Sequence, residues 1–245
     1  MILAVNIGNT NIRAALGDGS SRQTVFYADE GPVVDILEAG LGPIWDKIDK
    51  CILATVVPAS TEAVIASLEQ KIKKPVLRID IRNCGNLRTD RYEGLLGEDR
   101  VVCCYSALQK YTPPFVVIDF GTATTVNVVN AEGEFLGGAI MAGLQTGLTA
   151  LSKNTAQLPQ IKWTGGDIKL IGTNTAENLL SGAVIGLACA VEGFIERIQP
   201  VRTSDRLKVV VTGGHAPVIL PHCRFEYAHE PALLLEGLLS LGGNL

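Results

Sequence analysis

The sequence predicts an α/β protein built from two related halves, and three observations support this prediction. Apolar, β-branched runs alternate along the 245-residue chain with stretches of helical periodicity. A pattern of apolar strand, Asp or Asn, apolar residue, Gly and polar turn occurs twice, at 6–10 and at 119–123. A second β-rich run follows each copy. Because the copies lie almost half a chain length apart, we expect two similar subdomains that face each other.

In the first half, strand propensities and turn residues give the order of the elements. The expected elements are a hairpin of residues 2–7 and 12–16, a helix at 33–48, a strand at 52–57 closed by Pro58, a helix from Ser60 or Thr61 to about Lys73, and a strand at 76–81. Residues 82–98 form a polar, glycine-bearing loop, which is long enough to indicate a function. A helix from Asp99 to Lys110 follows, and two prolines stop it.

The second half begins with two strands joined by a turn within 116–129. The elements expected after it are a helix near 145–153, an irregular connector at 157–174, a helix at 176–198 and a strand at 209–212 that ends in glycines. The long helix has a stripe of large apolar residues and a stripe of small ones that includes Gly182, Gly186 and Gly193. Small residues allow another helix to approach closely, either inside the protein or across a subunit contact, and both interpretations stay open.

The turn after the strand at 116–120 combines an acid, a glycine and hydroxyl groups, at Asp119, Gly121, Thr122, Thr124 and Thr125. Glycine lets backbone N–H groups approach a ligand closely. N–H groups and hydroxyls can hold phosphate oxygens, and a carboxylate can hold the accompanying cation. An ordinary β-turn with threonines on the next strand is the alternative, and the matching turn at 6–10 favours the phosphate site.

The loop at 91–100 ends in Gly97, Glu98, Asp99 and Arg100. Asp99 lies at the expected start of a helix, where a carboxylate also serves as a cap. Alternatively, Asp99 and Asp119 form an acid pair around a transferring phosphoryl group, one accepting the proton of an attacking hydroxyl and the other holding a cation. Phosphoryl transfer needs mainly positioning and charge stabilisation, so two such acids suffice.

Composition indicates a well-packed cytoplasmic protein. The chain is 47% apolar and 19% charged, and its net charge of −4 includes no basic stripe, so nucleic-acid binding is not expected. The six cysteines show no C-x-x-C pair and are expected to be reduced. Met1 leads directly into a strand, so no signal peptide is expected. Charged and polar residues, Glu177, Asn178 and Glu192, interrupt the apolar stretch at 176–195, which argues against a membrane span.

Four motifs in order resemble type III pantothenate kinase. They are Gly8-Asn9-Thr10, Gly97-Glu98-Asp99-Arg100, the stretch 118–125, and Gly172-Thr173-Asn174-Thr175 before a helix. Ala156-Gln157-Leu158-Pro159 and Thr212-Gly213-Gly214 fit as well. The resemblance covers nearly the whole chain, and the ordered set is far more specific than any one motif.

The resemblance implies a duplicated ribonuclease-H-like (actin-like ATPase) fold of the acetate and sugar kinase, Hsc70 and actin superfamily, with ATP in a cleft between the halves. The implied subdomains are 1–114, with the first phosphate loop and the substrate loop, and 115–245, with the second phosphate turn and a dimer helix. The implied activity is ATP-dependent phosphorylation of pantothenate to 4′-phosphopantothenate, the first step of coenzyme A synthesis.

The resemblance also implies roles for single residues. Asp99 is the general base for the pantothenate hydroxyl, and Asp119 binds a monovalent cation, potassium or ammonium, while Mg²⁺ or another divalent metal accompanies ATP. The implied pantothenate-binding residues are Tyr92, Gly97, Glu98, Asp99, Arg100 and Thr175, the last near the interface of a homodimer or simply a helix N-cap. The implied ATP-binding residues are Asn6, Ile7, Gly8, Asn9, Thr10, Asn11, Ile12, Arg13 and Thr122.

Two residues depart from the pattern of this family. Asn6 stands where the family usually has Asp, and an amide lacks the charge that helps to hold magnesium and its waters. Tyr92 lies closer to Asp99 than the family's substrate tyrosine usually does. The alternatives are therefore another small-molecule kinase of the superfamily, with a different loop at 91–100, or a catalytically weakened nucleotide-binding regulator. Asp99, Arg100, Asp119 and Thr122 are retained, which argues against the regulator.

Overall fold

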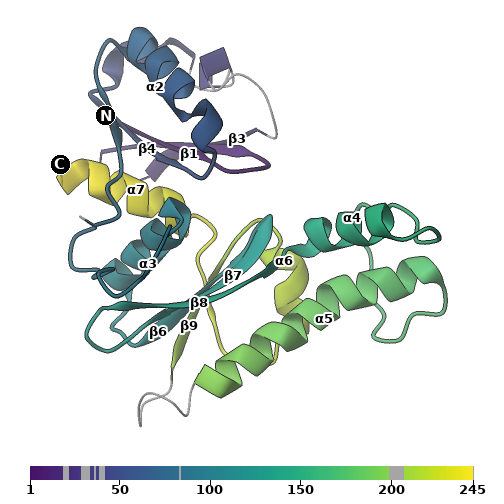
Figure 1. Ribbon diagram of the computed structural model, residues 1–245. Coiled ribbons are helices and arrows are strands. Elements are labelled where there is room, and N and C mark those ends of the chain that lie inside the picture. Colours follow the sequence, from purple (N-terminus) through teal and green to yellow (C-terminus); the bar gives the residue numbers. More distant parts are fainter. Residues whose placement is uncertain are drawn as a thin grey trace. The chain divides into compact units, whose positions relative to one another are not determined.

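The computed structural model describes residues 1–18, 22–28, 34–35, 37–38, 42–82, 84–198 and 207–244. Contacts divide the chain into two compact units, drawn with all elements in Figure 1. The first unit comprises Met1–Tyr111, Gly133–Phe135 and Ala232–Leu245, and the second comprises Thr112–Glu132 and Leu136–Pro231. The predicted division after residue 114 assigned the C-terminal segment to the second subdomain, whereas its contacts assign it to the first unit.

The sheet of the first unit has five strands in the order β3-β2-β1-β4-β5. Its strands are β1 (Ile2–Ile7), β2 (Ile12–Gly17), β3 (Arg22–Ala28), β4 (Lys50–Thr55) and β5 (Val76–Arg78). Strands β1, β2 and β3 form an antiparallel meander, whereas β4 runs parallel to β1, and β5 runs parallel to β4. The first hairpin is therefore confirmed.

The second unit repeats this arrangement. Its strands are β6 (Phe115–Phe120), β7 (Ala123–Val129), β8 (Phe135–Ala142), β9 (Lys208–Thr212) and β10 (Ala228–His229), in the order β10-β9-β6-β7-β8. Here β6 pairs antiparallel with β7 and parallel with β9, as β1 pairs with β2 and β4. The predicted duplication is confirmed, because the same strand order is built twice.

Helices cover the sheet of the first unit. Helix α2 (Pro58–Ile72) packs through Leu68 and Ile72 on the core that contains Leu3 and Val5. Helix α7 (Leu233–Asn244) lies beside α3 (Glu98–Lys110) and contacts β1 and β4. Most of α7 is buried, as expected for a helix with apolar residues on nearly every side. Burial of this helix against β1 and β4 is why the C-terminal segment belongs to the first unit.

In the second unit, α4 (Leu144–Asn154) and α5 (Thr175–Ile198) lie side by side (Figure 1). The short elements α6 (Ala216–Ile219) and η3 (Leu220–His222) pack on α5. One stripe of α5, including Leu187 and Val191, joins the core beneath it. By length and composition alone α5 passes the test for a membrane-crossing helix, a test that core helices also pass, and 28% of its most apolar window is buried.

The helices near 145–153 and at 176–198, the irregular connector and the strand at 209–212 are confirmed to within about two residues. The helix predicted at 33–48 lies partly outside the described residues, and 42–47 of it forms a 3₁₀ helix, η1 (Gly42–Lys47). Helix α2 begins at Pro58, so neither Ser60 nor Thr61 is its cap. Proline is favoured in the first turn of a helix, because the N–H groups of that turn have no acceptor within the helix and proline lacks this group. The prediction did not include β3, β8, β10, α6 or α7.

Candidate active site

The first candidate phosphate turn joins β1 to β2. The N–H of Gly8 donates to the carbonyl of Asn11 over 3.0 Å and closes the turn, while Asn9 and Thr10 are exposed. Asn6 precedes the turn, is buried, and pairs across the sheet with Arg13. Among the described residues, Asn6 Oδ1 has no hydrogen-bond partner. An unsatisfied buried acceptor is costly in a folded protein, so this oxygen is a natural contact for a ligand or a ligand's water.

The first turn of α3 presents Asp99. The N-cap position is Gly97, so Asp99 lies inside the helix and is not its cap. Its Oδ1 accepts the N–H of Arg100 over 2.8 Å, and a Cβ on residue 97 would lie only 2.6 Å from this oxygen. Burial raises the pKa of Asp99 above its ordinary value, while the N–H and the positive charge of Arg100 act in the opposite direction. A partly buried carboxylate with a raised pKa is suited to accept a proton.

Arg100 is buried beside two aromatic rings of the first unit. Its guanidinium carbon lies 5.7 Å from the ring centre of Tyr92 and 5.3 Å from that of Phe135. The two rings meet edge to face at 5.4 Å, and Arg100 Nη1 donates to the Tyr92 hydroxyl over 3.4 Å. The structure therefore brings Tyr92 next to the helix start that carries Asp99. Sequence reasoning missed Phe135, because nothing in its local pattern indicates this contact.

Glu98 is buried in the first unit, with both carboxylate oxygens bonded to protein groups. Oε2 accepts the N–H of Thr55 over 2.7 Å, and Oε1 accepts Nε and Nη2 of Arg78 over 2.8 and 2.7 Å. Sequence reasoning identified neither Thr55 nor Arg78. Both oxygens are therefore bonded within the protein, and a contact of Glu98 with pantothenate stays a prediction.

The second candidate phosphate turn joins β6 to β7. The N–H of Gly121 donates to the carbonyl of Ala123 over 3.2 Å. The carbonyl of Thr122 accepts the N–H of Gly143 over 3.1 Å and the hydroxyl of Thr146 over 2.6 Å. The side chain of Thr122 is exposed. The start of α4 therefore fixes the turn through its backbone and leaves the threonine side chain at the surface of the second unit.

Asp119 lies at the end of β6, against the glycine that follows β9. Gly213 has φ of 102°, and a Cβ there would lie 2.4 Å from Asp119 Oδ1 and 2.5 Å from the backbone of Phe120. His215 Nδ1 lies 3.3 Å from the carbonyl of Gly121. The strand ending in glycines thus reaches the Asp119 turn, and its glycine leaves room for the carboxylate.

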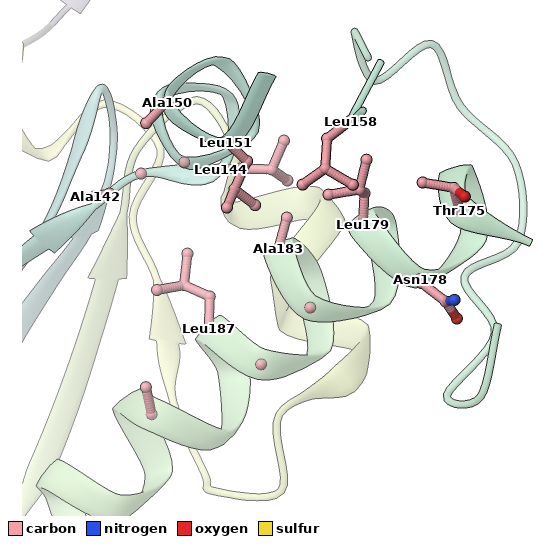
Figure 2. A pocket seen from close by; sticks show the side chains of 15 residues that line it. Ala142, Leu144, Ala150, Leu151, Leu158, Thr175, Asn178, Leu179, Ala183 and Leu187 are labelled. Carbon is pink, nitrogen blue, oxygen red and sulfur yellow. The ribbon is translucent and has the colours of Figure 1, made fainter. Parts of the chain in front are cut away.

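Thr175 begins α5 and lines an apolar groove of about 800 Å³ in the second unit. Figure 2 shows leucines of α4 and α5 and Leu158 pointing into the space between the helices, with Thr175 toward one end. Gly143, which contacts the Thr122 turn, lines the same groove. The side chain of Asn174, rather than Thr175, accepts the N–H of Glu177 over 3.0 Å. The helix-capping bond is therefore made by the preceding residue.

The donor groups suit a cation that is held by oxygen. Among the described residues no group of three or more His, Cys, Asp or Glu side chains could hold a metal ion. The Oδ1 atom of the Asp119 carboxylate is buried against Gly213, at a place that a Cβ on residue 213 would obstruct. A carboxylate oxygen is the kind of ligand that hard cations take in proteins.

A five-stranded sheet built twice, with a glycine turn after the first strand of each copy, defines the class of proteins with the actin-like fold. Solved structures with this fold include a Campylobacter jejuni protein assigned to the Baf family of transcriptional activators, at a TM-score of 0.64 and 20% identity, covering 99% of this chain and 100% of that one. Another is the activator of 2-hydroxyisocaproyl-CoA dehydratase from Clostridium difficile with bound ADPNP, at a TM-score of 0.55 and 14% identity, covering 99% and 93%.

The chain belongs to the type III pantothenate kinase family. The family profile matches residues 2–197. The type III pantothenate kinase of Rhodococcus jostii (strain RHA1) is 33% identical, over 97% of this chain and 93% of the relative. That of Nocardia farcinica (strain IFM 10152) is 34% identical, over 98% and 96%. The recognition made from the four motifs is thereby confirmed.

Proposed function

We propose that this protein phosphorylates pantothenate with ATP to give 4′-phosphopantothenate, the first step of coenzyme A biosynthesis. Family membership supports the substrate assignment. The observation that supports the chemistry is the first turn of α3, where Asp99 has a raised pKa beside Arg100. A carboxylate at such a place can remove a proton from a hydroxyl as that hydroxyl attacks.

In the proposed reaction, the 4′-hydroxyl oxygen of pantothenate attacks the γ-phosphorus of ATP. The bond from this phosphorus to the β–γ bridging oxygen breaks, ADP leaves, and the hydroxyl proton passes to Asp99. Arg100, Gly97 and Tyr92 contact pantothenate. Residues 6–13 and Thr122 contact the phosphates, since backbone N–H groups at glycine turns suit phosphate oxygens.

Cations would supply charge compensation for the phosphates. We assign the monovalent cation, potassium or ammonium, to the carboxylate of Asp119. Mg²⁺ or another divalent metal would compensate the negative charge of the phosphates during transfer. The protein's own part is to hold the Asp119 carboxylate at the end of β6, where Gly213 gives it room.

The purified protein is expected to convert pantothenate to 4′-phosphopantothenate with ATP, Mg²⁺ and potassium. The measurement is a coupled ADP-release assay, with the product identified by mass spectrometry. A sugar and a different small acid serve as comparison substrates. Product from a comparison substrate but none from pantothenate, over a full range of metal and nucleotide, would assign the chain to another kinase activity of the superfamily.

The metal requirement tests Asn6. This side chain is buried with an unsatisfied Oδ1, so an Asp in its place would add a negative charge without adding bulk. Asn6→Asp is expected to lower the Mg²⁺ concentration for half-maximal rate, because bonds to charged groups are worth roughly 1.5–3 kcal/mol. Arg13 lies opposite in the sheet, so pairing with it would reduce the effect. Identical metal titrations of the two proteins would show that position 6 acts through its backbone.

We further propose a homodimer with α5 at or near the contact. The groove between α4 and α5 is apolar, and Gly182 and Gly186 on α5 have nothing within 4 Å of an added Cβ. Gly182→Gln is therefore expected to leave each chain folded but to prevent close approach of a second copy. Light scattering should then give a dimer for the wild type and a monomer for the variant. An active wild-type monomer at low concentration would contradict this proposal.

The cytoplasm is the proposed location. The six cysteines, all within the described residues, form no disulfide, and burial raises the pKa of the Cys51 and Cys104 thiols to about 12. Thiols with such pKa values are protonated and unreactive at neutral pH, which suits packing in a reducing compartment.

A further inference from the structure

Glu98 is a buried, charged side chain of helix α3 that bonds to two strands of the first unit. It is 8% exposed, and its two oxygens receive three donor groups, the N–H of Thr55 and two nitrogens of Arg78. A buried carboxylate is costly unless it is paired and hydrogen-bonded. These contacts meet that condition at the end of β4 and the end of β5, so the carboxylate is directed at the protein's own strands.

Thr55 connects this contact to a wider buried network. Its hydroxyl accepts the N–H of Val57 over 3.1 Å and lies 3.3 Å from the Thr61 hydroxyl, which donates to the Val57 carbonyl over 2.9 Å. Thr55 and Thr61 are both nearly inaccessible to solvent. Glu98 therefore bonds to a strand end that is also hydrogen-bonded to the start of α2. Such a network limits the movement of every group bonded to it.

The same strand end holds the first phosphate turn. Thr55 pairs with Ile7 in the parallel register of β4 and β1, and the N–H of Val56 donates to the Ile7 carbonyl over 3.1 Å. Ile7 is the last residue before the turn at 8–11. The end of β4 thus has two partners. It pairs with the last residue before the phosphate turn, and it also bonds to Glu98, which is adjacent in sequence to Asp99.

We infer that Glu98 is a positioning residue that fixes Asp99 relative to the phosphate turn of the same unit. The inference rests on the proposed function, in which Asp99 is the general base. It replaces the expectation that Glu98 contacts pantothenate. Because the bonds run from the first turn of α3 to a strand end held by further hydrogen bonds, losing them lets that turn shift while the rest of α3 stays packed against α7.

Glu98→Gln is the main test, with Glu69→Gln as its matched control. Glu69 also accepts a strand N–H, that of Val76 over 3.0 Å, but it belongs to α2. Glutamine at 98 keeps the shape of the side chain but has one acceptor oxygen in place of two. Its NH₂ group would face a donor, either the Thr55 N–H or the Arg78 guanidinium. We expect Glu98→Gln to lower kcat by roughly 10- to 100-fold, the scale of a small misplacement. The KM for pantothenate should change little, and Glu69→Gln should leave both constants unchanged.

A double-mutant cycle separates positioning from substrate contact. If Glu98 acts only through Asp99, Glu98→Gln has no further effect on kcat when Asp99 is already Asn. A direct pantothenate contact would instead weaken pantothenate binding in calorimetry, and by the same factor in both backgrounds. That result would overturn the inference.

A measurement without substrate keeps the inference separate from the proposed activity. Hydrogen exchange of the amides of residues 98–101 should be faster in Glu98→Gln than in the wild type, and unchanged in Glu69→Gln. Faster exchange supports positioning even if pantothenate proves not to be the substrate, and unchanged exchange overturns it. Arg78→Gln, which removes the ion pair but keeps the Thr55 bond, should show a smaller effect of the same kind and replaces Glu98→Gln if that variant does not fold.

Discussion

Replacing Asp99 by Asn is expected to lower kcat by about 10²–10⁴-fold, the usual contribution of general acid–base catalysis. The fold should persist, because an amide oxygen can still accept the N–H of Arg100 that Asp99 Oδ1 accepts over 2.8 Å. The amide cannot take up the proton of the attacking hydroxyl. Steady-state kinetics will measure the loss of kcat. Thermal unfolding is the control, and it will show whether the fold persists.

The pH profile gives an independent check on the same residue. Burial raises the pKa of Asp99, so its carboxyl group stays protonated to a higher pH than an exposed aspartic acid. A general base must be deprotonated, so kcat should fall as pH falls through this raised pKa. The acid limb should be absent in Asp99→Asn. Near wild-type turnover in that variant would show that Asp99 is not the general base and has only a structural role in the first helical turn.

Gly213→Ala, next to the second phosphate turn, is expected to be strongly destabilising. The backbone at 213 has φ of 102°, where side chains are strained, and a Cβ would lie 2.4 Å from Asp119 Oδ1 and 2.5 Å from the Phe120 backbone. Backbone strain and overpacking each cost about 1–3 kcal/mol. To make room for the Cβ, the Asp119 carboxylate would have to move. Because this carboxylate is proposed to hold the monovalent cation, the potassium concentration needed for half-maximal rate should rise.

Gly193→Ala is the matched control in the same unit. This glycine lies inside α5, and an added Cβ would meet only the end of the flexible Arg197 side chain, at 3.0 Å. Because alanine favours helix over glycine by up to about 1 kcal/mol, the control should be neutral or stabilising. Chemical denaturation compares the two variants, and equal stability of Gly213→Ala and the wild type would refute the argument from close approach.

The sequence by itself determined the features that depend on short stretches of chain. Strand, turn and strand patterns gave the two hairpins, and helical spacing gave α5 to within one residue at its start. The repeated glycine turn predicted the duplication, which the matching strand orders confirm. Four motifs in order were enough to identify the family. All of these signals are local, because periodicity, propensity and motif spacing are properties of neighbouring residues.

Only the tertiary structure decided which distant residues meet. Helix α7 belongs to the first unit because its leucines are buried there, more than 100 positions from the strands that it contacts. Phe135 lies beside Arg100, and Thr55 and Arg78 bond Glu98, although no local pattern links these positions. A motif can state that Glu98 belongs to a site. Which oxygen is bonded, and to what, depends on the long-range packing that brings β4, β5 and α3 together.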